Sequence, residues 1–192
     1  MSLTTPDYGK AVLVRREFEA LEQYDNAIIT LTQAKLWAGV DGDELDGIID
    51  DNIQEAMDLV QEELNLSLNI RKVTATFESF AAETRLPNGP VVDVLSVKRL
   101  DKGEVHDIEG WYRRGDSIYF ETVYGYEHPY YRQGLEVEYL AGFWEVPAGL
   151  RAGIRQMMLT ILNDREDVIM GGVGMSEIPS NSRRKLMKYR RY

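Results

Sequence analysis

Two stretches that lie far apart in the sequence each carry one apolar stripe, and no other feature constrains the fold as strongly. Residues 45–64 and residues 150–162 place apolar side chains at every third or fourth position, the spacing of one face of an α-helix. Neither helix can bury its stripe alone, so we expect the two to pack together. Pro147 suits the first turn of the second helix. The stripe residues are Leu45, Ile48, Ile49, Ile53, Ala56, Met57, Val60 and Leu64, then Leu150, Ile154, Met157, Met158, Ile161 and Leu162.

The chain between these helices has a different period. From Ile70 to Tyr139, β-branched and aromatic residues recur near every second position between turn signals such as Pro87-Asn88-Gly89-Pro90. This pattern predicts several short antiparallel strands, whereas the tyrosine-rich segment 122–132 is typical of an exposed loop. The predicted inward positions are Val92, Val94, Leu95, Ile118, Phe120, Leu135, Val137 and Tyr139.

Helix start signals precede the first stripe. Thr30 and Gln33 have the spacing of a capping box, which predicts a short helix through Trp37. Residues 41–44 repeat this pattern ahead of the longer helix. Residues 8–24 show only a loose helical pattern, from which we expect an N-terminal helix or arm.

These patterns predict an α+β protein in which an α-helical bundle carries an inserted antiparallel β region and ends in an extended C-terminal tail. The glycine-rich run Gly171–Gly174 lacks the Gly-Lys-Ser/Thr ending of a phosphate loop and is interpreted as a hinge. The expected domains are an N-terminal arm or helix (1–27), the first segment of the helical bundle (28–69), the β region (70–143), the second segment of the bundle (144–170) and the hinge with a basic tail (171–192).

The composition excludes several kinds of site. The absence of cysteine excludes disulfides, thiolate catalysis and cysteine zinc sites, and His106 and His128 are the only histidines. No stretch has the roughly 20 apolar residues of a membrane helix, and no secretion signal pattern opens the chain. We therefore expect no membrane partner and a protein that is made in the cytoplasm.

No group of residues has a catalytic or metal-binding pattern, so we predict no enzyme activity, no metal and no cofactor. The acidic run that starts at Asp41 fails the EF-hand spacing, because Asp46 stands at the glycine position and Asn52 at the glutamate position. Glu136 and Glu138 have strand spacing and share one face, which is the minimum for a carboxylate pair. No cleft pattern accompanies them.

Charge is distributed unevenly along the chain. The net charge is −10, residues 41–63 contain ten acidic residues without Lys or Arg, and residues 183–191 contain six cations without an acid. Subtracting those six positive charges from −10 leaves −16 on residues 1–182. An acidic helix face is ordinarily solvated, but along a channel it would repel DNA phosphates. The acidic residues expected to face a lumen or a neighbouring subunit are Asp43, Glu44, Asp50, Asp51 and Asp58.

The basic tail is the most specific feature of the sequence. Apolar and aromatic residues alternate with its cations, which favours docking over a purely solvated tail. Composition leaves three kinds of partner open: nucleic acid, an anionic membrane or an acidic groove on a protein.

An ordered set of short motifs spans about residues 28 to 192, and together they resemble the head–tail connector, or adaptor, proteins of tailed double-stranded DNA bacteriophages. The motifs are Thr30-Leu31-Thr32-Gln33-Ala34-Lys35, the acidic amphipathic segment 43–64, Leu86-Pro87-Asn88-Gly89-Pro90-Val91, Tyr139-Leu140-Ala141-Gly142-Phe143, Val146-Pro147 with Leu150-Arg151, and Leu186-Met187-Lys188-Tyr189-Arg190.

This resemblance implies a non-enzymatic virion protein of the neck, assembled in the host cytoplasm. Such a protein forms a ring, usually a dodecamer, between the portal protein and the stopper or tail-completion protein, and double-stranded DNA passes through its lumen without specific binding. The resemblance also implies that the C-terminal segment docks onto the portal; here that segment is Arg183, Arg184, Lys185, Leu186, Met187, Lys188, Tyr189, Arg190 and Arg191.

Three alternatives stay open at the level of sequence. The first, within the same class, is a stopper or tail-completion protein. The second is a nucleic-acid-binding protein that uses the basic tail as a phosphate clamp, although the charge of −16 on the rest of the chain opposes this function. The third is a small hydrolase that uses Glu136 or the acidic helix as acid or base.

Overall fold

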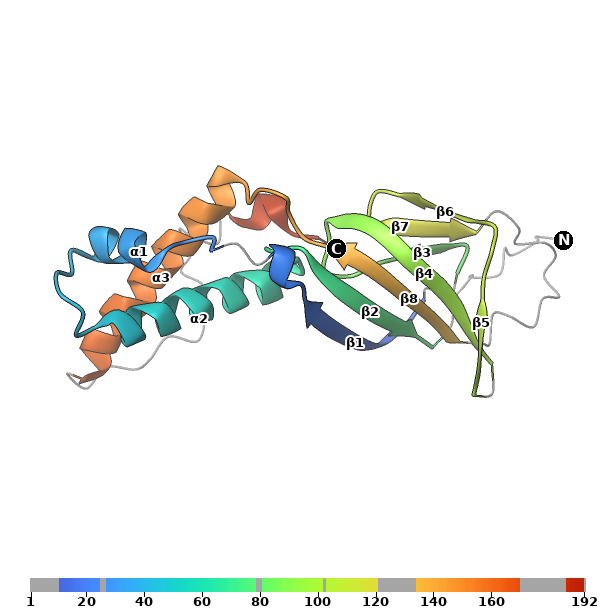
Figure 1. Ribbon diagram of the computed structural model, residues 1–192, viewed down its shortest axis with the longest axis horizontal. Helices are drawn as coiled ribbons and strands as arrows, with labels where there is room; N and C mark the ends of the chain where they lie inside the picture. The colour runs from blue at the N-terminus through green and yellow to red at the C-terminus, as the bar shows by residue number, and fades with distance from the viewer. Residues whose placement is uncertain are drawn as a thin grey trace, which may run out of the picture. The chain divides into compact units, whose positions relative to one another are not determined.

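The computed structural model describes residues 11–24, 27–78, 81–101, 103–120, 134–169 and 186–191. The chain divides into two compact units, both of which can be followed in Figure 1. The β unit comprises residues 1–23 and 70–142, and the helical unit comprises residues 24–69 and 143–192. A short 3-10 turn, η1 (Glu22–Tyr24), lies where the chain first passes from one unit to the other.

The helical unit is built from three described α-helices: α1 (Leu31–Ala38), α2 (Asp46–Leu64) and α3 (Ala148–Ile169). The expected packing of the two apolar stripes is present, since α2 contacts α3 and α1 contacts both. A second 3-10 turn, η3 (Met187–Tyr189), lies in the C-terminal segment. The main buried side chains of α2, α3 and this segment are Ile49, Ile53, Ala56, Val60, Leu64, Leu150, Ile154, Met157, Met158, Ile161 and Leu186.

One of the two predicted helix starts is confirmed. The Thr30 hydroxyl accepts a hydrogen bond from the backbone N–H of Gln33, and the Gln33 side chain accepts one from the N–H of Thr30, so α1 begins with a capping box. The second prediction was wrong, because α2 begins at Asp46 after Leu45, which makes no side-chain cap. Asp43, before α2, and Asp46, the first residue of α2, both form ion pairs with Lys35 of α1.

The β unit consists of two antiparallel sheets in the described part of the chain. The larger sheet has the strand order β1-β2-β8-β4-β5 and the smaller has the order β3-β7-β6. The strands are β1 (Leu13–Ala20), β2 (Arg71–Phe77), β3 (Glu83–Arg85), β4 (Val91–Asp101), β5 (Glu104–Asp107), β6 (Trp111–Arg114), β7 (Ser117–Phe120) and β8 (Gly134–Ala141).

The core of the β unit lies between these two sheets. Strand β8, at the centre of the larger sheet, alternates strictly between buried and half-exposed residues, as its sequence predicts. Of the predicted inward positions, those of β8 and Ile118 are buried. In β4 the prediction was wrong in part: Val94 packs half-buried against the core, but Leu95 is exposed, and Val91 and Val97 are buried instead. Two register shifts along β4 break the alternation that the prediction assumed.

The predicted fold class needs correction. The chain is not a helical bundle with an inserted β region, because eight strands in two antiparallel sheets accompany only three α-helices in the described residues. The expected N-terminal helix or arm is instead strand β1, which pairs with β2 along its whole length. Its apolar residues have no clean period because β1 is an edge strand with all eight residues exposed. Among the described residues, no helix is long and apolar enough to cross a membrane.

Tyr139 of β8 is hydrogen-bonded to the turn that connects β3 to β4. Its ring is buried, its hydroxyl donates a hydrogen bond of 2.7 Å to the Pro87 carbonyl oxygen, and burial raises the pKa of the Tyr139 phenol. We predict that Tyr139→Phe lowers the free energy of unfolding by about 1 kcal/mol at pH 7, because the partly buried Pro87 carbonyl loses its donor. Urea unfolding at pH 7 measures this change.

The same residue predicts a pH dependence. A raised folded-state pKa contributes stability that is complete below the unfolded-state pKa, near 10, and is lost as the pH rises above it. The wild type should therefore lose more stability than Tyr139→Phe between pH 9 and about pH 11. Equal losses in the two proteins over this range would contradict the assignment.

Candidate functional site

The C-terminal segment is seated on the helical unit. Leu186 is completely buried, and Met187 and Tyr189 pack against the same core. The backbone N–H of Arg191 donates to the carbonyl oxygen of Leu64 at the end of α2 (2.9 Å), and the Asn65 side chain donates to the carbonyl of Arg191. The segment therefore closes the end of the helical unit where α2 ends and α3 begins.

Two glycines of α3 make room for this segment. A Cβ built at Gly153 would lie 2.8 Å from Cγ of Leu186, and one at Gly149 would lie 2.5 Å from the Tyr189 hydroxyl. Gly149 and Gly153 are one helical turn apart and so form a continuous notch. A glycine inside a helix costs up to about 1 kcal/mol relative to alanine, and the fit of Leu186 supplies a reason for it here.

The segment also carries exposed charge. Lys188 and Arg190 are exposed, and the Lys188 ammonium lies 4.8 Å from the centre of the Tyr189 ring. Of the nine residues predicted to dock onto the portal, Leu186 is thus covered by the chain itself, whereas Lys188 and Arg190 face solvent. Arg183, Arg184 and Lys185 lie outside the described residues, and so do the predicted hinge Gly171–Gly174 and the tyrosine-rich loop.

The predicted acidic residues lie in two settings. Asp43 accepts a hydrogen bond from Lys35 at 2.9 Å, and Asp46 ion-pairs with Lys35 at 2.6 Å; the hydrogen bonds to Asp46 and Asp43 raise the pKa of Lys35. These two contacts link α1 to the start of α2. The other four predicted acidic residues are exposed as well: Glu44 lies before α2, and Asp50, Asp51 and Asp58 lie along it.

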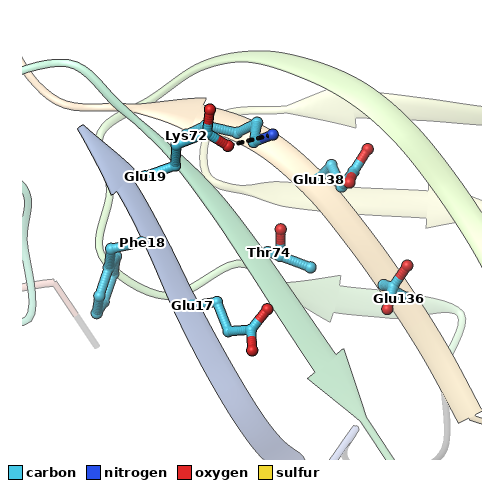
Figure 2. Close-up of a pocket in the computed structure, with 7 residues that line it drawn as sticks. All are labelled: Glu17, Phe18, Glu19, Lys72, Thr74, Glu136 and Glu138. Atoms are coloured by element: carbon cyan, nitrogen blue, oxygen red, sulfur yellow. Dashed lines mark ion pairs between the residues drawn. The ribbon is translucent and has the colours of Figure 1, made fainter. Parts of the chain in front are cut away.

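The outer face of the larger sheet carries a groove that the sequence did not indicate. The groove has a volume of about 680 Å³, and Figure 2 shows Thr74 between the carboxylates of β1 and those of β8. Glu19 forms an ion pair with Lys72, and this bond raises the pKa of Lys72. Seven residues line the groove: Glu17, Phe18, Glu19, Lys72, Thr74, Glu136 and Glu138.

The groove brings Glu136 and Glu138 together on one face, as their spacing predicted, but within a set of ion pairs. The Lys98 ammonium lies 3.9 Å from Glu136 and 3.6 Å from Glu138, and the Ser96 hydroxyl donates to Glu138 at 2.9 Å. Partly exposed ion pairs of this kind contribute at most about 1 kcal/mol each to stability. Glu19, Glu136 and Glu138 of the groove are thus ion-paired with lysines, and the groove contains no enclosed acid–base pair.

The remaining candidates for chemistry are dispersed. His106 is exposed on β5, with its Nε2 3.4 Å from the Glu104 carboxylate, and His128 lies outside the described residues. Within the ranges that the structure describes, no three His, Asp or Glu side chains converge as a metal site requires.

Sequence reasoning missed the residues that shape both surfaces. Glu17 and Glu19 alternate with strand period, but the loose helical pattern of the surrounding segment predicts a helix or arm. The four-residue spacing of Gly149 and Gly153 was the available signal for the notch, because two glycines on one face of a helix need a packing reason.

The fold has counterparts in gene transfer agent particles. Neither a protein-family model nor a curated protein sequence matches the chain. A chain in the neck of an empty gene transfer agent particle, computed with C6 symmetry, superposes with a TM-score of 0.71 at 12% identity, covering 92% of this chain and 95% of that one. A chain from the virion of a native gene transfer agent particle has a TM-score of 0.65 at 17% identity, with 87% and 93% covered.

A third counterpart comes from the neck of a native gene transfer agent particle computed with C12 symmetry. Its TM-score is 0.56 at 16% identity, with 87% of this chain and 93% of that chain covered. The similarity therefore extends over both units, and it establishes a shared fold with chains of such necks and virions.

The notch predicts that an alanine will have opposite effects at two helical glycines. At Gly153 a Cβ would overlap Leu186, whereas at Gly47 of α2 it would meet nothing within 4 Å. We expect Gly153→Ala to lower the free energy of unfolding by about 1–3 kcal/mol, since overpacking of a filled core is costly. Gly47→Ala, the matched control, should leave it unchanged or raise it by up to about 1 kcal/mol.

Urea unfolding of the full chain measures both changes. Leu186→Ala alone should cost about 2–4 kcal/mol, the usual range for a leucine removed from a core. Adding Gly153→Ala to Leu186→Ala should cost little more, because the overlapping atoms have gone. If the losses of the two single variants add up in the double variant, Leu186 does not pack against Gly153.

Proposed function

We propose that the chain is a structural protein of the neck of a phage-like particle. Within that neck it forms, as one of several identical subunits, the adaptor ring between the portal protein and the stopper or tail protein. The observation that carries this proposal is the full-length similarity to chains from the necks and virion of gene transfer agents, which spans 87–92% of the chain and both of its units. A match to one unit alone would support only a common module.

The surfaces described above favour assembly over catalysis. The carboxylates that come together on the larger sheet are partly exposed and ion-paired, so none is held in the dry, shaped pocket that acid–base chemistry requires. Exposed apolar side chains occur in both units, among them Val14 and Phe18 on β1, Leu36 on α1 and Trp144 before α3. Such residues are buried at low cost in subunit contacts.

A ring of identical subunits suits the neck. Two of the similar chains come from necks computed with C6 and C12 symmetry, and a closed cyclic ring needs two different surfaces on each subunit that meet head to tail. We propose a dodecamer for this chain. Its net charge of −10 suits a channel through which double-stranded DNA must move, because an acidic wall repels phosphates instead of binding them.

We predict that the protein forms a ring-sized complex with the portal protein of the same particle. Multi-angle light scattering on the protein alone, on the portal alone and on the mixture gives the masses, and electron microscopy of the mixture gives the symmetry. Twelve copies per portal ring are expected. A monomer that ignores the portal but binds DNA at low salt would favour the nucleic-acid-binding alternative, while binding only to an assembled portal–adaptor complex would favour the stopper role.

A further inference from the structure

The seated C-terminal segment is a basic surface fixed on an acidic protein. Residues 186–191 contain three cations and no acid, and the burial of Leu186 with the backbone bond to Leu64 holds the segment in place. Lys188 lies over the first turn of α3, since a Cβ at Gly149 would be 3.4 Å from its ammonium. The Lys188 charge therefore has a defined position before any partner binds, so binding does not have to order the backbone of the segment.

The outer face of α2 has the opposite charge. Helix α2 contains seven acidic residues and no Lys or Arg. Its buried residues Ile49, Ile53 and Val60 define the side that faces the core. At 100° per residue, the opposite side of the helix carries a row of exposed carboxylates at a spacing of three or four residues. The row is Asp51, Glu55, Asp58 and Glu62.

These two surfaces belong to different sides of the same helical unit. The acidic row points away from the core that α2 shares with α3, while the basic segment packs on the Gly149 and Gly153 side of α3. Within one subunit, Lys188 lies over the first turn of α3. In a ring, head-to-tail contacts bring one side of a subunit against a different side of the next, so Lys188 of one subunit can reach the acidic row of another.

We propose that the basic segment of one subunit, through Lys188 and Arg190, binds the acidic outer face of α2, at Asp51 and Asp58, on the next subunit of the ring. This inference rests on the proposed ring and specifies which surfaces close it. The two surfaces are complementary in charge, and such complementarity sets orientation and partner choice at an interface. The contact also places positive charge on a helix face whose carboxylates otherwise repel one another.

Two charge-reversal variants of the full chain test this contact. The first reverses the basic side (Lys188→Glu with Arg190→Glu), and the second reverses the acidic side (Asp51→Lys with Asp58→Lys). Each variant alone should fail to form rings, with the protein concentration at half-assembly raised at least tenfold, because like charges then meet at every contact. Light scattering in the presence of the portal protein measures the assembly.

An equimolar mixture of the two variants should restore the ring. Each basic-side variant then presents an acidic segment to a basic α2, and each acidic-side variant presents a basic segment to an acidic α2, so the two alternate around an even-numbered ring. Rings that contain both variants in a one-to-one ratio, by native mass spectrometry, are the expected result. Raised salt should weaken wild-type assembly as well, since the charged side chains are exposed.

The matched control reverses two exposed acids on β5, Glu104→Lys with Asp107→Lys, which changes the net charge as much as the acidic-side variant does. It should assemble like the wild type, and circular dichroism should show all variants folded. Normal assembly of the basic-side variant alone would overturn the proposal. So would folded variants that stay apart when mixed, which would assign the basic segment to the portal or to DNA. Failure of the wild type to assemble with portal would instead count against the proposed function.

Discussion

The packing of α2 against α3 is the contact on which the rest of the molecule depends. The two helices are separated by more than eighty residues of sequence, and nearly all of that interval is the β unit. Their contact buries two apolar stripes, which α1 and the C-terminal segment cover further, and it brings both ends of the inserted segment together. The insertion can then fold as a sandwich with its own core, because neither sheet needs a side chain from the helices.

A feature of this fold could be predicted from the sequence only where the spacing of neighbouring residues was sufficient to define it. The two amphipathic helices, the Thr30 capping box and the alternation of β8 follow from spacing alone, and the structure confirms each of them. Strand β1 was missed because its residues are all exposed and carry no inward pattern. It is a strand only because β2, more than fifty residues later, offers a pairing edge, and that information is not local. The fold class was wrong for the same reason.

The C-terminal segment shows how a charged sequence can hide a packing role. Its six cations within nine residues suggest a solvated or docking tail, and the interleaved apolar residues suggest contacts with a partner. The partner of Leu186 is instead the chain's own notch at Gly153. Charge can be read from the composition. The notch, by contrast, is formed by the absence of two side chains on a helix that is distant from the segment in sequence. Which apolar residue fills such a space is settled by geometry alone.

This division of roles within one segment bears on the proposed ring, in which an acidic protein would both assemble and surround DNA. Carboxylates on every face would repel neighbouring subunits as well as phosphates, and the charge of −16 outside the tail makes that conflict severe. A short basic segment that is anchored on one side of the helical unit would limit the attraction between subunits to that side. On α2, Asp51 and Asp58 face away from the core, while Asp50 lies about a quarter-turn to one side of them. In the proposed ring, one acidic helix would have a face for a neighbouring subunit and keep other carboxylates available for the lumen.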